Sequence, residues 1–127
     1  MSRRKEIKVG VRPVRDAARE FIAVCEAIDR GERPALIERI DFEDIMTFAR
    51  VLTPRRLELL RILHACGKMT ARTLAHALKR DSRNVEADIQ MLVRTGLIEA
   101  SRGRVRVPWE TVTLSAQIGA KPVRHAA

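Results

Sequence analysis

Apolar residues recur at spacings of three and four along most of the chain, which is typical of amphipathic helices. In the N-terminal part, the spacing predicts a helix over 13–31, with an apolar stripe made of Val14, Ala18, Phe21, Cys25 and Ile28. Polar and apolar residues alternate over 6–11 and predict a short strand before this helix. Asp41 is the expected N-cap of a further short helix. That helix would bury Ile45, Phe48, Ala49 and Leu52.

Helix start and stop residues are clearest from residue 53 onward. Thr53, followed by Pro54, is the expected N-cap of a helix that ends at Gly67. Thr70 begins a second, short helix, and a third helix follows a turn and ends at Gly96. The predicted buried positions of these three helices are Leu57, Leu60, Leu63, Leu74, Ala75, Leu78, Val85, Ile89 and Leu92.

A hairpin is predicted after the third helix. Residues 97–98 resemble one strand, 100–103 a turn and 104–109 the return strand, and 111–118 could form another strand. Helix, short helix, turn, helix and hairpin is the order of a winged helix-turn-helix. We therefore expect a mainly α fold with a small β wing, preceded by an N-terminal strand and a helical region for dimerisation or partner binding.

Three segments are expected from these patterns. Residues 1–52 would form the N-terminal region, 53–118 the winged domain and 119–127 a frayed tail. The 127 residues, with 46% apolar and 32% charged side chains, are typical of a soluble globular protein. The sequence has no apolar run of membrane-spanning length and no secretory h-region. Together with two distant cysteines, this predicts a cytoplasmic protein with no membrane association.

Net charge is +9, and most of the excess lies in one segment. Residues 53–107 hold 12 Lys or Arg against 5 Asp or Glu, whereas residues 1–52 hold 11 against 10. A local excess of this kind favours a polyanionic partner.

The third predicted helix carries polar side chains opposite its apolar stripe. Arg83 and Asn84 lie in its first turn, where side chains of such helices reach base edges, and Arg and Asn can pair with guanine and adenine. Arginines alternate with Gly103, Val105 and Val107 in the hairpin, so they would share one exposed face. The predicted DNA-contacting residues are Thr70, Arg72, Arg80, Ser82, Arg83, Asn84, Ala87, Gln90, Arg102, Arg104 and Arg106. Each feature alone is also typical of a solvated face, and the hypothesis depends on their combination.

The stretch from Leu52 to Leu114 resembles a MarR-like family of winged-helix DNA-binding proteins of archaea and bacteria. The shared elements are an LTPRRLELL opening, the RDSRNVEAD entry to the third helix and the GLIEASRGRVRVPW segment. The strand and helix of the N-terminal half, and a helix near Phe42, are also similar. Members of the family are often encoded beside a small toxin, in some cases of the TumE type. The resemblance implies an antitoxin that represses its own operon. Ala87 departs from the family, where a larger and often basic residue is expected.

An enzymatic role has little support. The three histidines, His64, His76 and His125, have no His or carboxylate partner at ligand spacing, and Cys66 resembles a small buried residue. We expect neither a metal nor a cofactor.

A protein-interaction module without specific DNA recognition is the alternative function. The helix over 14–28 has apolar residues on more than one face, and its proposed interface residues are Val14, Ala18, Phe21, Ile22, Cys25 and Ile28. It could bind a toxin or a second copy of the chain, or it could simply pack on its own domain. A homodimer is expected because a single winged helix contacts too few base pairs for useful specificity.

Overall fold

The protein is described by a computed structural model that covers residues 3–34 and 38–118. In these residues five helices and five strands form a mixed α/β fold. The elements in order are β1 (Arg4–Val11), α1 (Val14–Asp29), β2 (Glu38–Phe42), α2 (Ile45–Val51), α3 (Pro54–Cys66), α4 (Ala71–Leu78), α5 (Ser82–Thr95), β3 (Glu99–Ser101), β4 (Arg104–Arg106) and β5 (Trp109–Leu114). No helix in the described part of the chain is both long and apolar enough to span a bilayer.

Three strands form a parallel sheet in the order β2-β1-β5. Val9 of β1 lies opposite Ile40 of β2 and Leu114 of β5. Because side chains alternate along a strand, Ile7 and Val9 point into the core, while Glu6 and Lys8 remain partly exposed on the other face. The sheet makes the fold mixed α/β, and the expectation of a mainly α fold was wrong in this respect.

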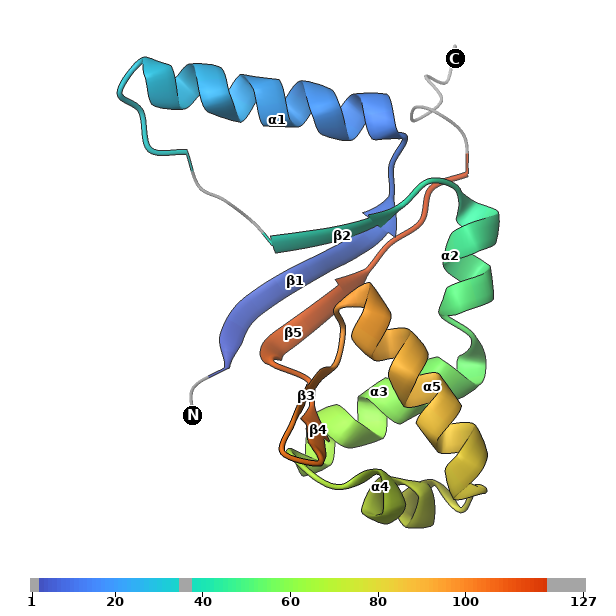
Figure 1. The fold of residues 1–127 in the computed structure, drawn as a ribbon. Helices are drawn as coiled ribbons and strands as arrows, with labels where there is room; N and C mark the ends of the chain where they lie inside the picture. The colour runs from blue at the N-terminus through green and yellow to red at the C-terminus, as the bar shows by residue number, and fades with distance from the viewer. Residues whose placement is uncertain (1–2, 35–37, 119–127) are drawn as a thin grey trace, which may run out of the picture.

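One hydrophobic core joins the sheet to helices α3, α4 and α5. It includes Ile7, Val9 and Phe42 from the N-terminal half, and Leu59, Leu63, Leu74, Val85, Leu92, Leu97 and Trp109 from the rest. Figure 1 shows α3, α4 and α5 on one side of the sheet and α1 on the other. The N-terminal strands thus share a core with the helices that follow them.

The predicted helix caps of the central segment are confirmed. The hydroxyl of Thr53 accepts a hydrogen bond from the Arg56 N–H, and that of Thr70 accepts one from the Thr73 N–H. Asp81, which was not predicted as a cap, caps α5 by accepting from the Arg83 N–H at 2.8 Å. Gly96 ends α5 with a φ of 95°, a backbone conformation that favours glycine.

The prediction around Asp41 was wrong. Asp41 and Phe42 lie in β2, and the helix starts later, with Asp44 as its N-cap. The Thr47 N–H donates to the Asp44 carboxylate and lowers its pKa. Within α2, Ala49 is exposed and Phe48 is half-buried, but Leu52, the residue that caps the end of α2, is buried as expected.

The boundaries of the later strands also differ from the prediction. Leu97 and Ile98 are buried but precede β3, the turn is confined to Arg102 and Gly103, and the return strand ends at Arg106. The last strand is 109–114 because it follows its partner β1 in parallel register. The predicted tail over 119–127 lies outside the described residues. Cys66 is exposed, so the expectation that it is buried was wrong.

Within residues 3–34 and 38–118, helix α1 does not pack on other elements through its apolar stripe. Ala27 is the buried residue of α1. Val14, Phe21, Ile22 and Ile28 each expose more than half of their surface. The described part of the chain therefore does not cover the stripe, contrary to the possibility that this helix simply packs on its own domain.

Candidate nucleic-acid interface

Helix α5 divides into an inward and an outward face. Val85, Ile89 and Leu92 are buried, as predicted. Residues spaced by four, three and four positions lie on one face of a helix. In α5, four residues with this spacing form a line directly opposite the buried stripe. The line consists of Arg83, Ala87, Gln90 and Arg94, all exposed. Arg94 was missed by the sequence analysis, although this spacing could have identified it.

The first turn of α5 is open to solvent. Ser82, Arg83 and Asn84 are exposed, and the Asp81 cap fixes the backbone at Arg83. The turn before α5 is short because Lys79 adopts a left-handed conformation, with φ at 55°, and the Arg80 N–H then bonds to the Ala75 carbonyl at 3.0 Å. This turn places the end of α4 beside the start of α5.

Thr70 and Arg72 lie at the start of α4, and both are exposed. The Thr70 hydroxyl accepts from the Thr73 N–H and donates to the Thr73 hydroxyl at 2.9 Å. Thr70 is therefore engaged in its capping role, while the guanidinium of Arg72 has no carboxylate within ion-pair distance among the described residues.

The hairpin of β3 and β4 presents its arginines in three different ways. Arg104 is exposed on β4, next to the buried Val105. Arg106 is half-buried and bonds to Glu99, its cross-strand neighbour, with 3.1 Å between Nη2 and Oε1. Arg102 lies in the turn itself, with φ at 53°. The expectation that all three share one strand face was therefore wrong, because Arg102 lies outside both strands.

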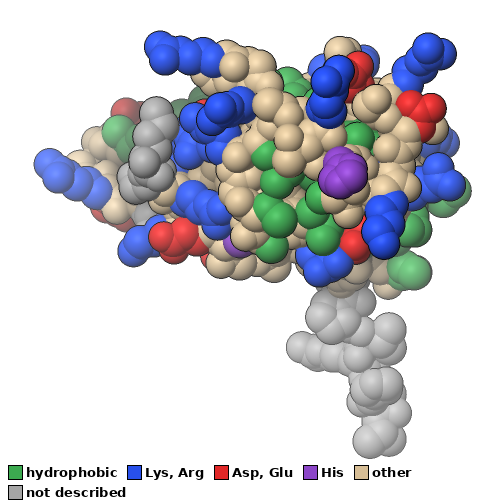
Figure 2. Space-filling model, turned by 90° about the horizontal axis from the view of Figure 1, so that it is seen from below, with side chains coloured by type: hydrophobic (Ala, Val, Ile, Leu, Met, Phe, Trp, Pro, Cys, Tyr) green, Lys and Arg blue, Asp and Glu red, His purple; other side chains and the backbone are tan. Residues whose placement is uncertain are grey.

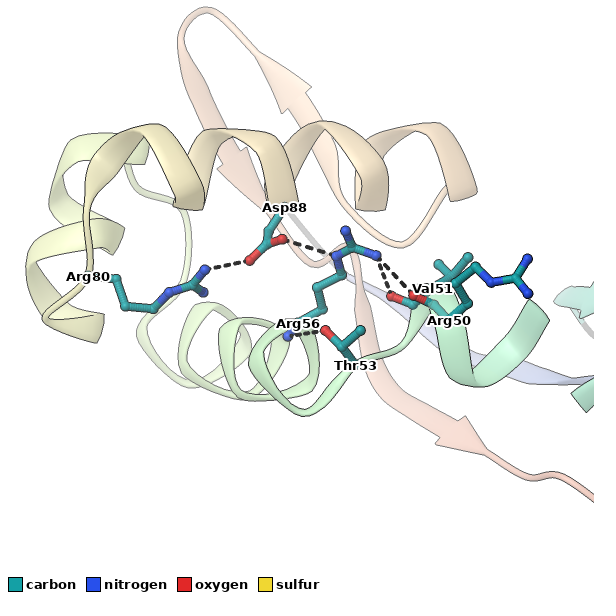
Figure 3. Close-up of polar contacts among 6 residues, drawn as sticks. All are labelled: Arg50, Val51, Thr53, Arg56, Arg80 and Asp88. Atoms are coloured by element: carbon teal, nitrogen blue, oxygen red, sulfur yellow. Dashed lines mark hydrogen bonds and ion pairs between the residues drawn. The ribbon is translucent and has the colours of Figure 1, made fainter. Parts of the chain in front are cut away.

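Arg80 is held inside the fold. Its Nη2 donates to Oδ2 of Asp88 at 2.7 Å, and Arg56 donates from Nε to the other oxygen at 3.1 Å (Figure 3). Arg56 also donates to the Val51 carbonyl at 2.9 Å. These contacts connect the start of α3 and the turn before α5 to the middle of α5. Arg80 thus positions α5, and it is not part of the exposed surface formed by Arg83 and Asn84.

The internal ion pairs leave a group of basic side chains unneutralised. In residues 53–107, Arg56, Arg61, Arg80 and Arg106 pair with carboxylates. Within the described chain, no carboxylate lies at ion-pair distance from Arg55, Lys68, Arg72, Lys79, Arg83, Arg94, Arg102 and Arg104. Figure 2, which views the side where α4 lies, shows Lys and Arg side chains around a central area of hydrophobic and His side chains. This arrangement leaves positive charge available to an external polyanion.

Among the described residues, no three His, Cys, Asp or Glu side chains come together as metal ligands would. His64 is occupied structurally, since its Nε2 lies 2.8 Å from the Glu110 carbonyl and 3.0 Å from that of Trp109.

Comparison with known families assigns residues 51–114, half of the chain, to the family described as HVO_A0114. The chain belongs to this family. The matched segment extends from the end of α2 to the end of β5, so it contains α5 and the hairpin. No curated protein and no solved structure matches the chain.

Proposed function

We propose that this protein is a winged helix-turn-helix DNA-binding protein that regulates transcription, with α5 as the recognition helix and the β3–β4 hairpin as the wing. The observation that carries the proposal is the outward face of α5. An arginine lies at each end of the exposed line from Arg83 to Arg94, while Val85, Ile89 and Leu92 on the opposite side of the helix are buried.

Charge distribution supports the same arrangement. Most carboxylates of 53–107 are engaged in contacts within the chain: Asp88, Glu58 and Glu99 bind arginines, and Asp81 caps α5. Only Glu86 adds an exposed carboxylate to α5. The free basic side chains of α4, α5 and the hairpin could then contact phosphates on both sides of a groove occupied by α5.

A titration with matched variants tests the proposal. Fluorescence anisotropy would compare a duplex from upstream of the protein's own gene with a scrambled duplex, at several salt concentrations. We expect the wild type to prefer the upstream duplex by ~10³ or more. Arg83→Ala should remove most of that preference, because Arg83 is placed to contact bases. Arg104→Ala should weaken binding to both duplexes alike. It should also reduce the slope of log affinity against log salt concentration by about one unit.

Arg33→Ala is the matched control, because Arg33 is exposed in the loop that follows α1, and α1 lies on the other side of the sheet from α5 (Figure 1). It removes the same charge and should leave binding unchanged. Equal affinity for both duplexes, or a preference that survives Arg83→Ala, would contradict the proposal.

The narrower form of the proposal is an antitoxin that represses its own operon in the cytoplasm. It is supported by the resemblance of residues 52–114 to MarR-like proteins. Growth of cells that express the neighbouring gene, with and without this protein, tests it. Rescue of growth is expected, and a neighbouring gene that is harmless when expressed alone would refute it.

A further inference from the structure

Helix α1 presents an apolar face that nothing in the described chain covers. Val14 is 70% exposed and Phe21 69%, and Ile22 and Ile28 are each 55% exposed. Cys25, on the same stripe, is exposed as well. A helix of 16 residues with such a stripe gains most of its stability from packing against a partner. The charged residues beside the stripe indicate which partner would fit this face.

Along one edge of the stripe, basic residues lie toward the N-terminal end of α1 and acidic residues toward its C-terminal end. Arg15, Ile22 and Asp29 follow one another at spacings of seven and so lie in one row beside the stripe. Arg19 and Glu26, also seven residues apart, form a second row outside the first. In both rows the N-terminal member is basic and the C-terminal member is acidic. All four charged side chains are exposed, and no described residue forms an ion pair with them.

This order of charges is complementary to itself when the helix direction is reversed. Antiparallel pairing centred on Ile22 places Arg15 of one helix beside Asp29 of the other, at both ends, with the two Ile22 side chains between them. In a parallel pair this row would instead face the opposite edge of the partner helix, where Ala17 and Val24 offer no counter-charge.

We propose that the α1 face binds a second copy of this chain, with the two α1 helices antiparallel and Arg15 paired with Asp29 across the interface. The stripe of Val14, Ala18, Phe21, Cys25 and Ile28 forms the buried centre. The pairing does not depend on DNA, so its failure and a failure of DNA binding are separate results.

Sedimentation equilibrium of the full chain, without DNA, tests the pairing with charge swaps. The wild type should dimerise, and Arg15→Asp should weaken the dimer about tenfold because two attractive contacts become repulsive. Asp29→Arg should weaken it similarly. The double variant Arg15→Asp/Asp29→Arg should dimerise like the wild type, and so should an equimolar mixture of the two single variants.

Oxidation of Cys25 tests independently whether the two α1 helices are antiparallel or parallel. In the antiparallel pair the two Cys25 residues are offset by six positions, about 9 Å along the axis, which is too far for a disulfide. In a parallel pair they face each other. A Cys66→Ser variant should therefore stay uncrosslinked under mild oxidation. A monomer at tens of micromolar, an unchanged Arg15→Asp dimer or a disulfide-linked Cys66→Ser dimer would each overturn the proposal.

Discussion

The carboxylate of Asp88 accepts a hydrogen bond from the guanidinium of Arg80, with 2.7 Å between Oδ2 and Nη2. Both side chains are largely buried, at 14% and 18% exposure. Arg56 binds the second oxygen of the same carboxylate. Asp88 thus holds two arginines from the segments on either side of α4. Because the face of α5 opposite Asp88 carries Arg83 and Gln90, the same contacts fix the orientation of the proposed recognition helix.

Replacing Asp88 should destabilise the fold. Asp88→Ala leaves the guanidinium groups of Arg56 and Arg80 partly buried without a counter-charge, and we expect a loss of about 2 kcal/mol in the free energy of unfolding. Urea denaturation measures it. The control is Glu58→Ala, which breaks the exposed ion pair with Arg61 and should change stability little. Equal losses for the two variants would show that the Asp88 contacts do not hold α5.

Glu99 is expected to restrain DNA binding by the hairpin. It bonds to Arg106 and keeps one positive charge of the wing neutralised. Glu99→Gln should release Arg106 and raise affinity for both the specific and the scrambled duplex by about three- to tenfold, with a steeper salt dependence. Anisotropy titrations against salt measure this. Glu32→Gln, which breaks the Arg30 pair after α1, is the control and should have no effect. An unchanged affinity in Glu99→Gln would place Arg106 outside the interface.

The parts of the fold that could be predicted from the sequence are those set by local chemistry. Thr53 and Thr70 are recognisable as N-caps because the residues they bond lie three positions further along the chain. The buried stripe of α5 follows from its spacing alone. The charge excess of 53–107 also needs only the sequence, although its interpretation needed the structure to show which arginines are paired.

The parts that could not be predicted depend on contacts between distant residues. Strand β2 offers only Ile40 and Phe42 as alternating apolar positions, and it is a strand because it pairs with β1, about thirty residues earlier. Asp41 resembles a helix cap in sequence, but in the sheet its carboxylate binds Arg39 and Arg12. Arg80 similarly looks like a surface arginine until the fold brings it to Asp88.

Asp41 should make stability depend on pH. Hydrogen bonds from Arg39, at 2.9 and 3.1 Å, lower the pKa of its carboxyl below the ordinary value of 3.8. A lowered pKa in the folded state means that the stabilisation is present above about pH 4 and is lost as the pH falls through the folded-state pKa. Between pH 5 and 2.5, we expect the wild type to lose stability more steeply than Asp41→Asn, as measured by urea denaturation at each pH. Parallel curves for the two proteins would show that the Asp41 charge contributes nothing.

The effect of replacing Arg94 distinguishes a recognition helix from a surface that is only basic. It lies at the C-terminal end of the exposed line on α5, about 16 Å along the axis from Arg83. In the proposed orientation the first turn of α5 reaches the bases, so Arg94 would contact a phosphate at the far side of the groove. Arg94→Ala should therefore weaken the specific and scrambled duplexes equally and reduce the salt dependence by about one unit, while the preference between them is kept. Arg83→Ala should lose the preference instead. If Arg94→Ala removes the preference and Arg83→Ala does not, α5 enters DNA with its other end, and the proposed orientation of the helix is reversed.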